Sequence, residues 1–170
     1  MIHKIDEHSL LRDFYALFAE VECGRLFNFS DKRHDEWLRR RVSRYFFSGT
    51  QFFGDYSEDD RPLGFAGVLI DEPLYGTELF NLKAVLTHIG VIQEFRRTKH
   101  GSDILVAIEK YALNQGAYCI YTSTWARSTE AITFYLANGY IPIATLPDVY
   151  GPNYEGDTYL RKVLGIKSDK

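Results

Sequence analysis

Apolar and polar positions follow two different periods along this chain. Alternating or continuous short apolar runs predict strands, whereas apolar residues at i, i+3 and i+4 predict helices. Strands are therefore expected at 2–5, 50–56, 63–70, 84–91, 118–124, 140–145 and 157–164. Helices are expected at 10–21, 32–47 and 103–113, and between Ser128 and Gly139. The helix from 32 takes Ser30 or Asp31 as its N-cap, and Ser128 caps the last one. By itself the pattern predicts one domain over residues 1–170, α/β or α+β, with a mixed sheet.

Composition narrows the classes of function. With 45% hydrophobic and 15% aromatic residues, the chain is expected to fold around an apolar core. Its net charge of −3 argues against a nucleic-acid partner, although basic clusters occur at 32–44 and 96–100. The first cluster is expected to be the solvated face of a helix. Two cysteines, Cys23 and Cys119, favour reduced thiols over a disulfide framework.

Nothing in the hydropathy pattern indicates a membrane protein. The first seven residues contain no apolar leader region, and no apolar stretch approaches the length of a membrane span. We therefore expect a cytoplasmic protein with no membrane partner and no metal.

A basic turn, Arg96–Ser102, lies between the strand predicted at 84–91 and the helix predicted from 103. The first N–H groups of a helix have no internal partners, and the helix dipole favours an anion there. Arg96, Arg97 and Lys99 add positive charge to the same place. The turn is thus expected to bind a polyphosphate, although a solvated surface turn has the same composition. The P-loop and dinucleotide-binding glycine motifs are both absent from the sequence.

Two spaced motifs carry a resemblance to a known family. Val91, Arg96 and Gly101 match V-x-x-x-x-[QR]-x-x-G-x-[GA], with Lys99 in place of the first glycine. The later motif N-x-x-A-x-x-F-Y-x-x-x-G-[FY] has Ser128 in place of Asn and matches at Ala131, Phe134, Tyr135, Gly139 and Tyr140. Over residues 84–163 the chain resembles the GNAT superfamily of acetyl-CoA-dependent N-acetyltransferases.

This resemblance implies a twisted, mostly antiparallel sheet with helices on both faces. It implies an enzyme that moves an acetyl group from acetyl-CoA to a primary amine, of a small molecule or a protein, directly in a ternary complex. The alternative is a catalytically silent domain that binds coenzyme A or acyl-CoA as a sensor or assembly piece. Homodimerisation, known among relatives, is also possible under this resemblance.

The resemblance also implies roles for individual residues. The main chain of Ile89, Gly90 and Val91 would bind the pantetheine arm, and Ser128 would belong to the cofactor site. Tyr135 would be the general acid that protonates the leaving thiolate. The diphosphate would be bound by the basic turn, that is by Arg96, Arg97, Thr98, Lys99, His100, Gly101 and Ser102.

The general base is less well defined. The places where relatives carry a base hold Thr87, Val85 and Ser123, none of which is a base of useful strength. His88 is the candidate, although strand alternation puts it on the opposite face from Thr87. Glu72, Glu78 and a water relayed by Thr87, Ser123 or tyrosines remain open.

The same resemblance implies an acceptor site at residues 20–50, 71–80 and 146–156, although the last of these segments also has the composition of a simple turn between two strands. Its walls would be aromatic, and its carboxylates would attract a cationic amine. The residues concerned are Tyr75, Phe80, Tyr150 and Tyr154, with Asp148, Glu155 and Asp157.

Overall fold

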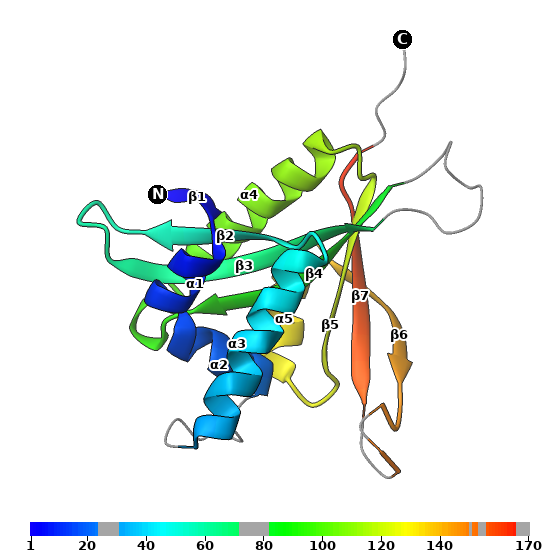
Figure 1. The fold of residues 1–170 in the computed structure, drawn as a ribbon. Helices are drawn as coiled ribbons and strands as arrows, with labels where there is room; N and C mark the ends of the chain where they lie inside the picture. Colours follow the sequence, from blue (N-terminus) through cyan, green and yellow to red (C-terminus); the bar gives the residue numbers. More distant parts are fainter. Residues whose placement is uncertain (24–30, 72–81, 150, 153–155, 166–170) are drawn as a thin grey trace. The chain divides into compact units, whose positions relative to one another are not determined.

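The computed structural model describes residues 1–23, 31–71, 82–149, 151–152 and 156–165. Its strands are β1 Ile2–Ile5, β2 Gln51–Tyr56, β3 Pro62–Asp71, β4 Lys83–Val91, β5 Cys119–Trp125, β6 Ile141–Leu146 and β7 Asp157–Val163 (Figure 1). Its helices are α1 Glu7–Asp13, α2 Tyr15–Cys23, α3 Lys32–Phe47, the short 3-10 helix η2 Gln93–Phe95, α4 His100–Asn114 and α5 Thr129–Ala137. Every strand predicted from the hydrophobic pattern is present.

The strands form one seven-stranded sheet in the order β1-β2-β3-β4-β5-β7-β6. β4 and β5 are parallel, and Ala84 faces Ile120 in their register. The pairs β1–β2, β2–β3, β5–β7 and β6–β7 are antiparallel. The expected mixed, mostly antiparallel sheet is therefore confirmed.

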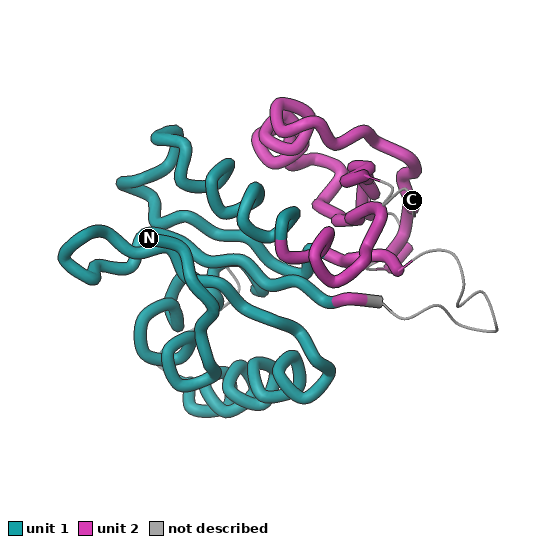
Figure 2. Tube along the Cα trace, turned by 90° about the horizontal axis from the view of Figure 1, so that it is seen from above, with its two compact units in different colours: residues 1–69, 86–110 teal, residues 70–85, 111–170 magenta. Residues whose placement is uncertain are grey.

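Two compact units divide the chain (Figure 2). Unit 1 comprises residues 1–69 and 86–110, and unit 2 comprises residues 70–85 and 111–170. β4 and α4 each contribute residues to both units. A single domain over the whole chain stays a prediction.

In unit 1, α4 covers one face of the strands, and α1, α2 and α3 cover the other (Figure 2). α3 begins at its predicted N-cap Asp31, whose side chain accepts a hydrogen bond from the Arg33 N–H at 2.9 Å. Its Leu38 and Val42 are fully buried, so the arginine-rich side of the helix faces solvent as predicted. The core of the unit consists of Ile5, Leu10, Phe14, Leu17, Phe18, Ala19, Leu38, Val42, Phe52, Tyr56 and Phe65.

The single helix predicted over 10–21 is wrong, because the structure has two helices there. α1 ends at Asp13, and Phe14 leaves the helical region with φ −123° and ψ 10°. α2 then begins at Tyr15. Phe14 is 1% exposed, so the break turns a large aromatic ring into the core between the two helices.

Unit 2 contains the pair formed by β5 and the first residues of β4, followed by α5, β6 and β7. α5 ends before Gly139, whose φ of +83° is the left-handed conformation expected of a C-terminal glycine. Ser128 is at the N-cap position as predicted, but its side chain makes no capping hydrogen bond. Tyr135 and Tyr140 are buried in this unit, at 5% and 1% exposure.

Candidate active site

The basic turn adopts the backbone geometry of an anion site. φ is +65° at Arg97 and +73° at Lys99, and it is negative at the intervening Thr98. Backbone that alternates in this way points successive N–H groups into one concavity, which binds anions. Lys99 stands where the family motif has glycine. Since glycine adopts a positive φ without strain from a Cβ, the left-handed backbone at this position explains why glycine is the usual residue there.

The same turn opens helix α4. The Asp103 N–H donates to the Lys99 carbonyl at 2.9 Å, which closes the first turn of the helix. Within the described part of the chain, the main-chain N–H groups of Thr98, Lys99 and Gly101 donate to no acceptor. Open donors, the positive end of the helix dipole and an exposed lysine together fit a diphosphate group.

Some side chains of the turn hold the turn itself. The Arg96 guanidinium donates to the Val91 carbonyl at 2.9 Å and to Glu20 at 2.8 Å. The Thr98 hydroxyl donates to the Phe95 carbonyl. Arg96 therefore ties the turn to the end of β4, whereas the Lys99 side chain has no partner among the described residues.

His100, the first residue of α4, contacts a buried carboxylate. Its Nδ1 lies 2.7 Å from Oδ2 of Asp55 on β2. The Asp55 side chain is 5% exposed and that of His100 is 29% exposed. Asp55 thus fixes the orientation of the imidazole at the start of the helix, and no local sequence pattern predicts this contact.

Ile89, Gly90 and Val91 form the end of β4 next to the turn, and all three are half-buried. A Cβ at Gly90 would lie 2.8 Å from Cγ2 of Val21 and 3.1 Å from Cγ of Leu17. Glycine is therefore required at this position for the close packing of α2 on β4. This requirement leaves the main-chain groups of Ile89–Val91 as the part of the strand that could bind a ligand.

His88 lies on the face of β4 that packs against α2, and its side chain is 3% exposed. Its Nε2 lies 2.8 Å from Oε2 of Glu22 on α2. Glu22 also accepts a hydrogen bond from Nε of Arg41 on α3 at 2.5 Å. Burial alone would raise the pKa of Glu22, but the hydrogen bonds from His88 and Arg41 outweigh it and lower that pKa. Sequence reasoning missed Glu22 and Arg41, because nothing local marks their pairing with His88.

In unit 2, Tyr135 projects from α5 into a buried position against β5. The Thr122 hydroxyl donates to the Tyr135 hydroxyl at 3.4 Å. Burial raises the pKa of Tyr135, and the hydrogen bond from Thr122 opposes that shift only in part. Tyr135 is therefore protonated at neutral pH, which is what a proton donor needs.

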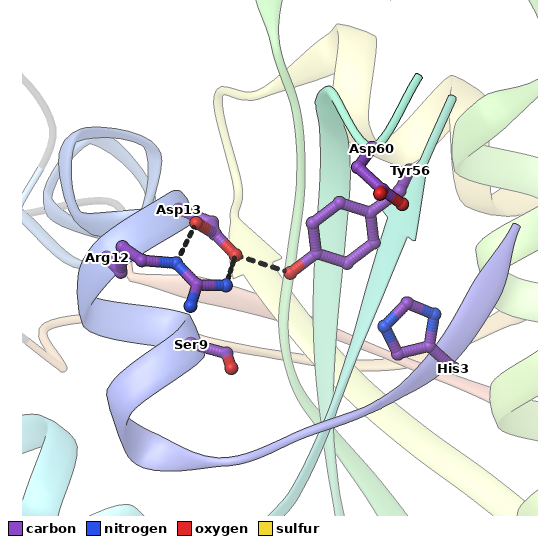
Figure 3. A pocket seen from close by; sticks show the side chains of 6 residues that line it. All are labelled: His3, Ser9, Arg12, Asp13, Tyr56 and Asp60. Carbon is purple, nitrogen blue, oxygen red and sulfur yellow. Dashed lines mark hydrogen bonds and ion pairs between the residues drawn. The ribbon is translucent and has the colours of Figure 1, made fainter. Parts of the chain in front are cut away.

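A separate pocket of about 370 Å³ in unit 1 contains none of the predicted site residues (Figure 3). It is lined by His3, Ser9, Arg12, Asp13, Tyr56 and Asp60. Arg12 is already paired with Asp13 through two contacts of 2.7 Å, and the Tyr56 hydroxyl donates to the same carboxylate at 2.8 Å. The guanidinium of the pocket is thus neutralised, and the site is not an anion site.

Several residues proposed from the sequence lie outside the described part of the chain. They are Ser30 as an alternative cap, Glu72 and Glu78 as alternative bases, and Tyr75, Phe80, Tyr150, Tyr154 and Glu155 of the acceptor site. Ser123, considered above as a relay for a water, is exposed, and its hydroxyl donates to Asp157 at 3.4 Å.

Comparison with known proteins identifies the family. The model of the Acetyltransferase (GNAT) family matches residues 11–140, which include both the basic turn and Tyr135. The chain belongs to this family. The predictions of an acetyltransferase and of acetyl-CoA as its cofactor are confirmed at the level of the family. The comparison with curated protein sequences gives no match.

Solved structures of the same fold are similar over nearly the whole chain. An aminoglycoside 6'-acetyltransferase type Ii is 19% identical, with a TM-score of 0.72, 96% of this chain covered and 97% of that one. An aminoglycoside 6'-N-acetyltransferase complexed with coenzyme A is 16% identical, with a TM-score of 0.73 and 99% of both chains covered. The PaiA N-acetyltransferase of Thermoplasma acidophilum, in complex with coenzyme A, is 18% identical, with a TM-score of 0.66, 96% of this chain covered and 98% of that one. At these identities the likeness shows the shared fold.

Among the described residues, no helix is long and apolar enough to cross a membrane.

Proposed function

We propose that this acetyltransferase moves the acetyl group of acetyl-CoA to a primary amine, by direct attack in a ternary complex. The observation that carries the proposal is the turn at 97–101, with its alternating φ and its open N–H groups at the start of α4. The family match over 11–140 supports the same reaction class. The cytoplasm as the location, a homodimer and the absence of a nucleic-acid partner remain part of this proposal.

Binding depends on main-chain groups more than on side chains. The N–H groups of the turn donate hydrogen bonds to the diphosphate oxygens, and Arg97 and Lys99 add positive charge at the exposed rim of the turn. The main chain of Ile89–Val91 binds the pantetheine arm, and the Ser128 hydroxyl, which makes no capping bond, adds a polar contact. Most of the rate advantage then comes from holding the thioester and the amine in reacting geometry.

Two proton transfers complete the reaction. When bound, acetyl-CoA supplies an activated acyl group whose leaving group is a thiolate. Tyr135 gives its phenolic proton to that sulfur, and burial keeps the phenol protonated until then. His88, which is paired with the carboxylate of Glu22, is the proposed acceptor of the proton that the amine loses.

The first test measures cofactor binding and acetyl transfer separately. Calorimetry with acetyl-CoA is expected to give a Kd that the double variant Arg97→Ala/Lys99→Ala weakens. A panel of primary amines, followed by thiol release and product mass, then identifies acceptors. Binding without transfer to any amine would contradict the proposed reaction and favour a domain that only binds the cofactor.

Tyr135→Phe tests the general acid. We expect kcat to fall by about 10²–10⁴-fold, with the Kd of acetyl-CoA unchanged. Tyr140→Phe is the matched control, since it removes a hydroxyl from a buried ring whose centroid lies 5.4 Å from that of Tyr135. Equal loss in both variants would mean that packing, not proton donation, explains the effect.

A further inference from the structure

Three side chains of unit 1 are joined by consecutive hydrogen bonds: Glu22 on α2, and His88 and Thr87 on β4. Oε2 of Glu22 lies 2.8 Å from Nε2 of His88. Nδ1 of the same imidazole lies 3.0 Å from the hydroxyl oxygen of Thr87. Both ring nitrogens of a buried histidine are therefore engaged, one by a carboxylate and the other by an alcohol.

The surroundings keep the carboxylate ionised and the imidazole fixed. The His88 ring lies 4.9 Å from the ring of Phe18, 4.5 Å from that of Tyr45 and 5.8 Å from that of Phe52, measured between centroids. The charged and titratable groups in contact with His88 or its carboxylate partner are Glu22 from α2 and Arg41 and Tyr45 from α3. Arg41 contacts Glu22 at 2.5 Å, and the Tyr45 hydroxyl donates to Glu22 at 3.4 Å.

This network assigns the direction of each hydrogen bond. An ionised carboxylate only accepts, so the Nε2 of a neutral His88 must carry the proton that is shared with Glu22. Nδ1 is then the unprotonated nitrogen, and Thr87 must donate its hydroxyl proton to it. The assignment follows from the network, since hydrogens themselves are not observed.

An alcohol that donates to a histidine, which in turn donates to a carboxylate, is the arrangement that activates hydroxyl groups in enzymes. Here the two buried members have side chains 3% and 10% exposed, whereas Thr87 is half-buried. Thr87 is therefore the end of the series that a substrate can reach. It also precedes Ile89–Val91 on the same strand, next to the proposed cofactor site.

We propose that Thr87, His88 and Glu22 form a relay that takes the proton of the acceptor amine. The proposal rests on the acetyltransferase function proposed above. Thr87 is the catalytic residue that meets the amine, and His88 and Glu22 act through it.

The proton balance of the step is complete. As the amine nitrogen bonds to the acetyl carbon and the carbon–sulfur bond breaks, the nitrogen gives its proton to the Thr87 oxygen. Thr87 passes its own proton to Nδ1 of His88, and Glu22 stabilises the resulting imidazolium. Tyr135 protonates the sulfur. After product release His88 loses a proton to solvent and Tyr135 regains one, so the enzyme returns to its starting state.

The kinetic test uses variants that change the hydroxyl alone. Thr87→Val keeps the shape and removes the hydroxyl, and Thr87→Ser keeps the hydroxyl. With an acceptor found in the amine panel, we expect Thr87→Val to lower kcat by about 10²-fold or more and Thr87→Ser to stay within a few-fold of wild type. The Kd of acetyl-CoA and the melting temperature should change little in either variant.

A double variant separates the relay from a structural role. If the residues act as a unit, Thr87→Val/His88→Gln loses no more activity than the more damaging single variant. Independent, multiplicative losses would contradict the relay, as would a fully active Thr87→Val. An acetyl group found on Thr87 by mass spectrometry would also overturn it, because the hydroxyl would then be a nucleophile.

A measurement on the free protein does not depend on turnover. With ¹⁵N-labelled histidine, NMR of the neutral form of His88 should place its proton on Nε2, and Glu22→Gln should weaken that preference. A proton on Nδ1 in wild type would overturn the relay. A wild type that binds acetyl-CoA but acetylates no amine would instead contradict the proposed function, and the relay with it.

Discussion

The strain of the left-handed backbone at Lys99 can be measured by comparing the stabilities of two variants. Lys99→Gly and Lys99→Ala remove the same charge, but only glycine adopts a φ of +73° without a clash involving Cβ. The strain of a non-glycine residue in this region amounts to about 1 kcal/mol. We therefore expect Lys99→Gly to be more stable than Lys99→Ala by about 1 kcal/mol, or about 2–4 °C in melting temperature for a chain of this size.

Lys110 provides the matched control on the same helix. It is exposed in α4, where φ is helical, so glycine there should be less stable than alanine by about 1 kcal/mol. Thermal unfolding of the four variants thus gives opposite signs at the two positions. If Lys99→Ala proves as stable as Lys99→Gly, the left-handed turn is not held in solution and the proposed anion site loses its geometry. Calorimetry adds a second readout, because both Lys99 variants should weaken acetyl-CoA binding equally, by about fivefold at most.

Three further predictions concern the elements around the site. Gly90→Ala should destabilise unit 1 by about 1–3 kcal/mol in urea unfolding, because the new Cβ meets Val21 and Leu17 at 2.8 Å and 3.1 Å, and unchanged stability would contradict that packing. Asp55→Asn weakens the contact with His100, so it should cost about 1–3 kcal/mol of stability and weaken acetyl-CoA binding. An unchanged Kd in a less stable variant would show that His100 does not orient the turn. The pKa of Glu22 is below its ordinary value of 4.5, so its contribution to stability is present above that pH and is lost as the pH falls through the lowered pKa. Glu22→Gln should therefore lose less stability than wild type between neutral and acid pH in pH-dependent unfolding.

The hydrophobic pattern predicted the elements well because burial imposes it directly. It failed at Phe14, and the reason is geometric. Leu10, Phe14, Leu17 and Phe18 are all buried, and their spacing is the same as that of one continuous amphipathic helix. The break lies in the backbone angles of a single residue, which side-chain polarity does not record.

The candidate site was predictable to different degrees for its different parts. The basic turn could be located from its charges and from Gly101, but the positive φ at Arg97 and Lys99 could not, because neither residue favours it. Strand alternation predicted that His88 lies on the opposite face of the strand from Thr87, and the alternating burial along β4 agrees with it. Glu22, the partner of His88, is 66 residues away in sequence, and no local pattern links two residues so far apart.

These differences follow from how each part of the site works. An anion bound by main-chain N–H groups needs a particular backbone shape, and a short spaced motif is enough to encode it. Proton transfer needs side chains from several elements, here α2, α3 and β4, which only the folded chain brings together. The family motif therefore identifies the cofactor in a sequence that departs from it at Lys99 and Ser128. It leaves the base open, and in the proposed relay of Thr87, His88 and Glu22 the carboxylate comes from a helix instead of from the strand. In this arrangement the hydroxyl on the strand can be tested without disturbing the cofactor site.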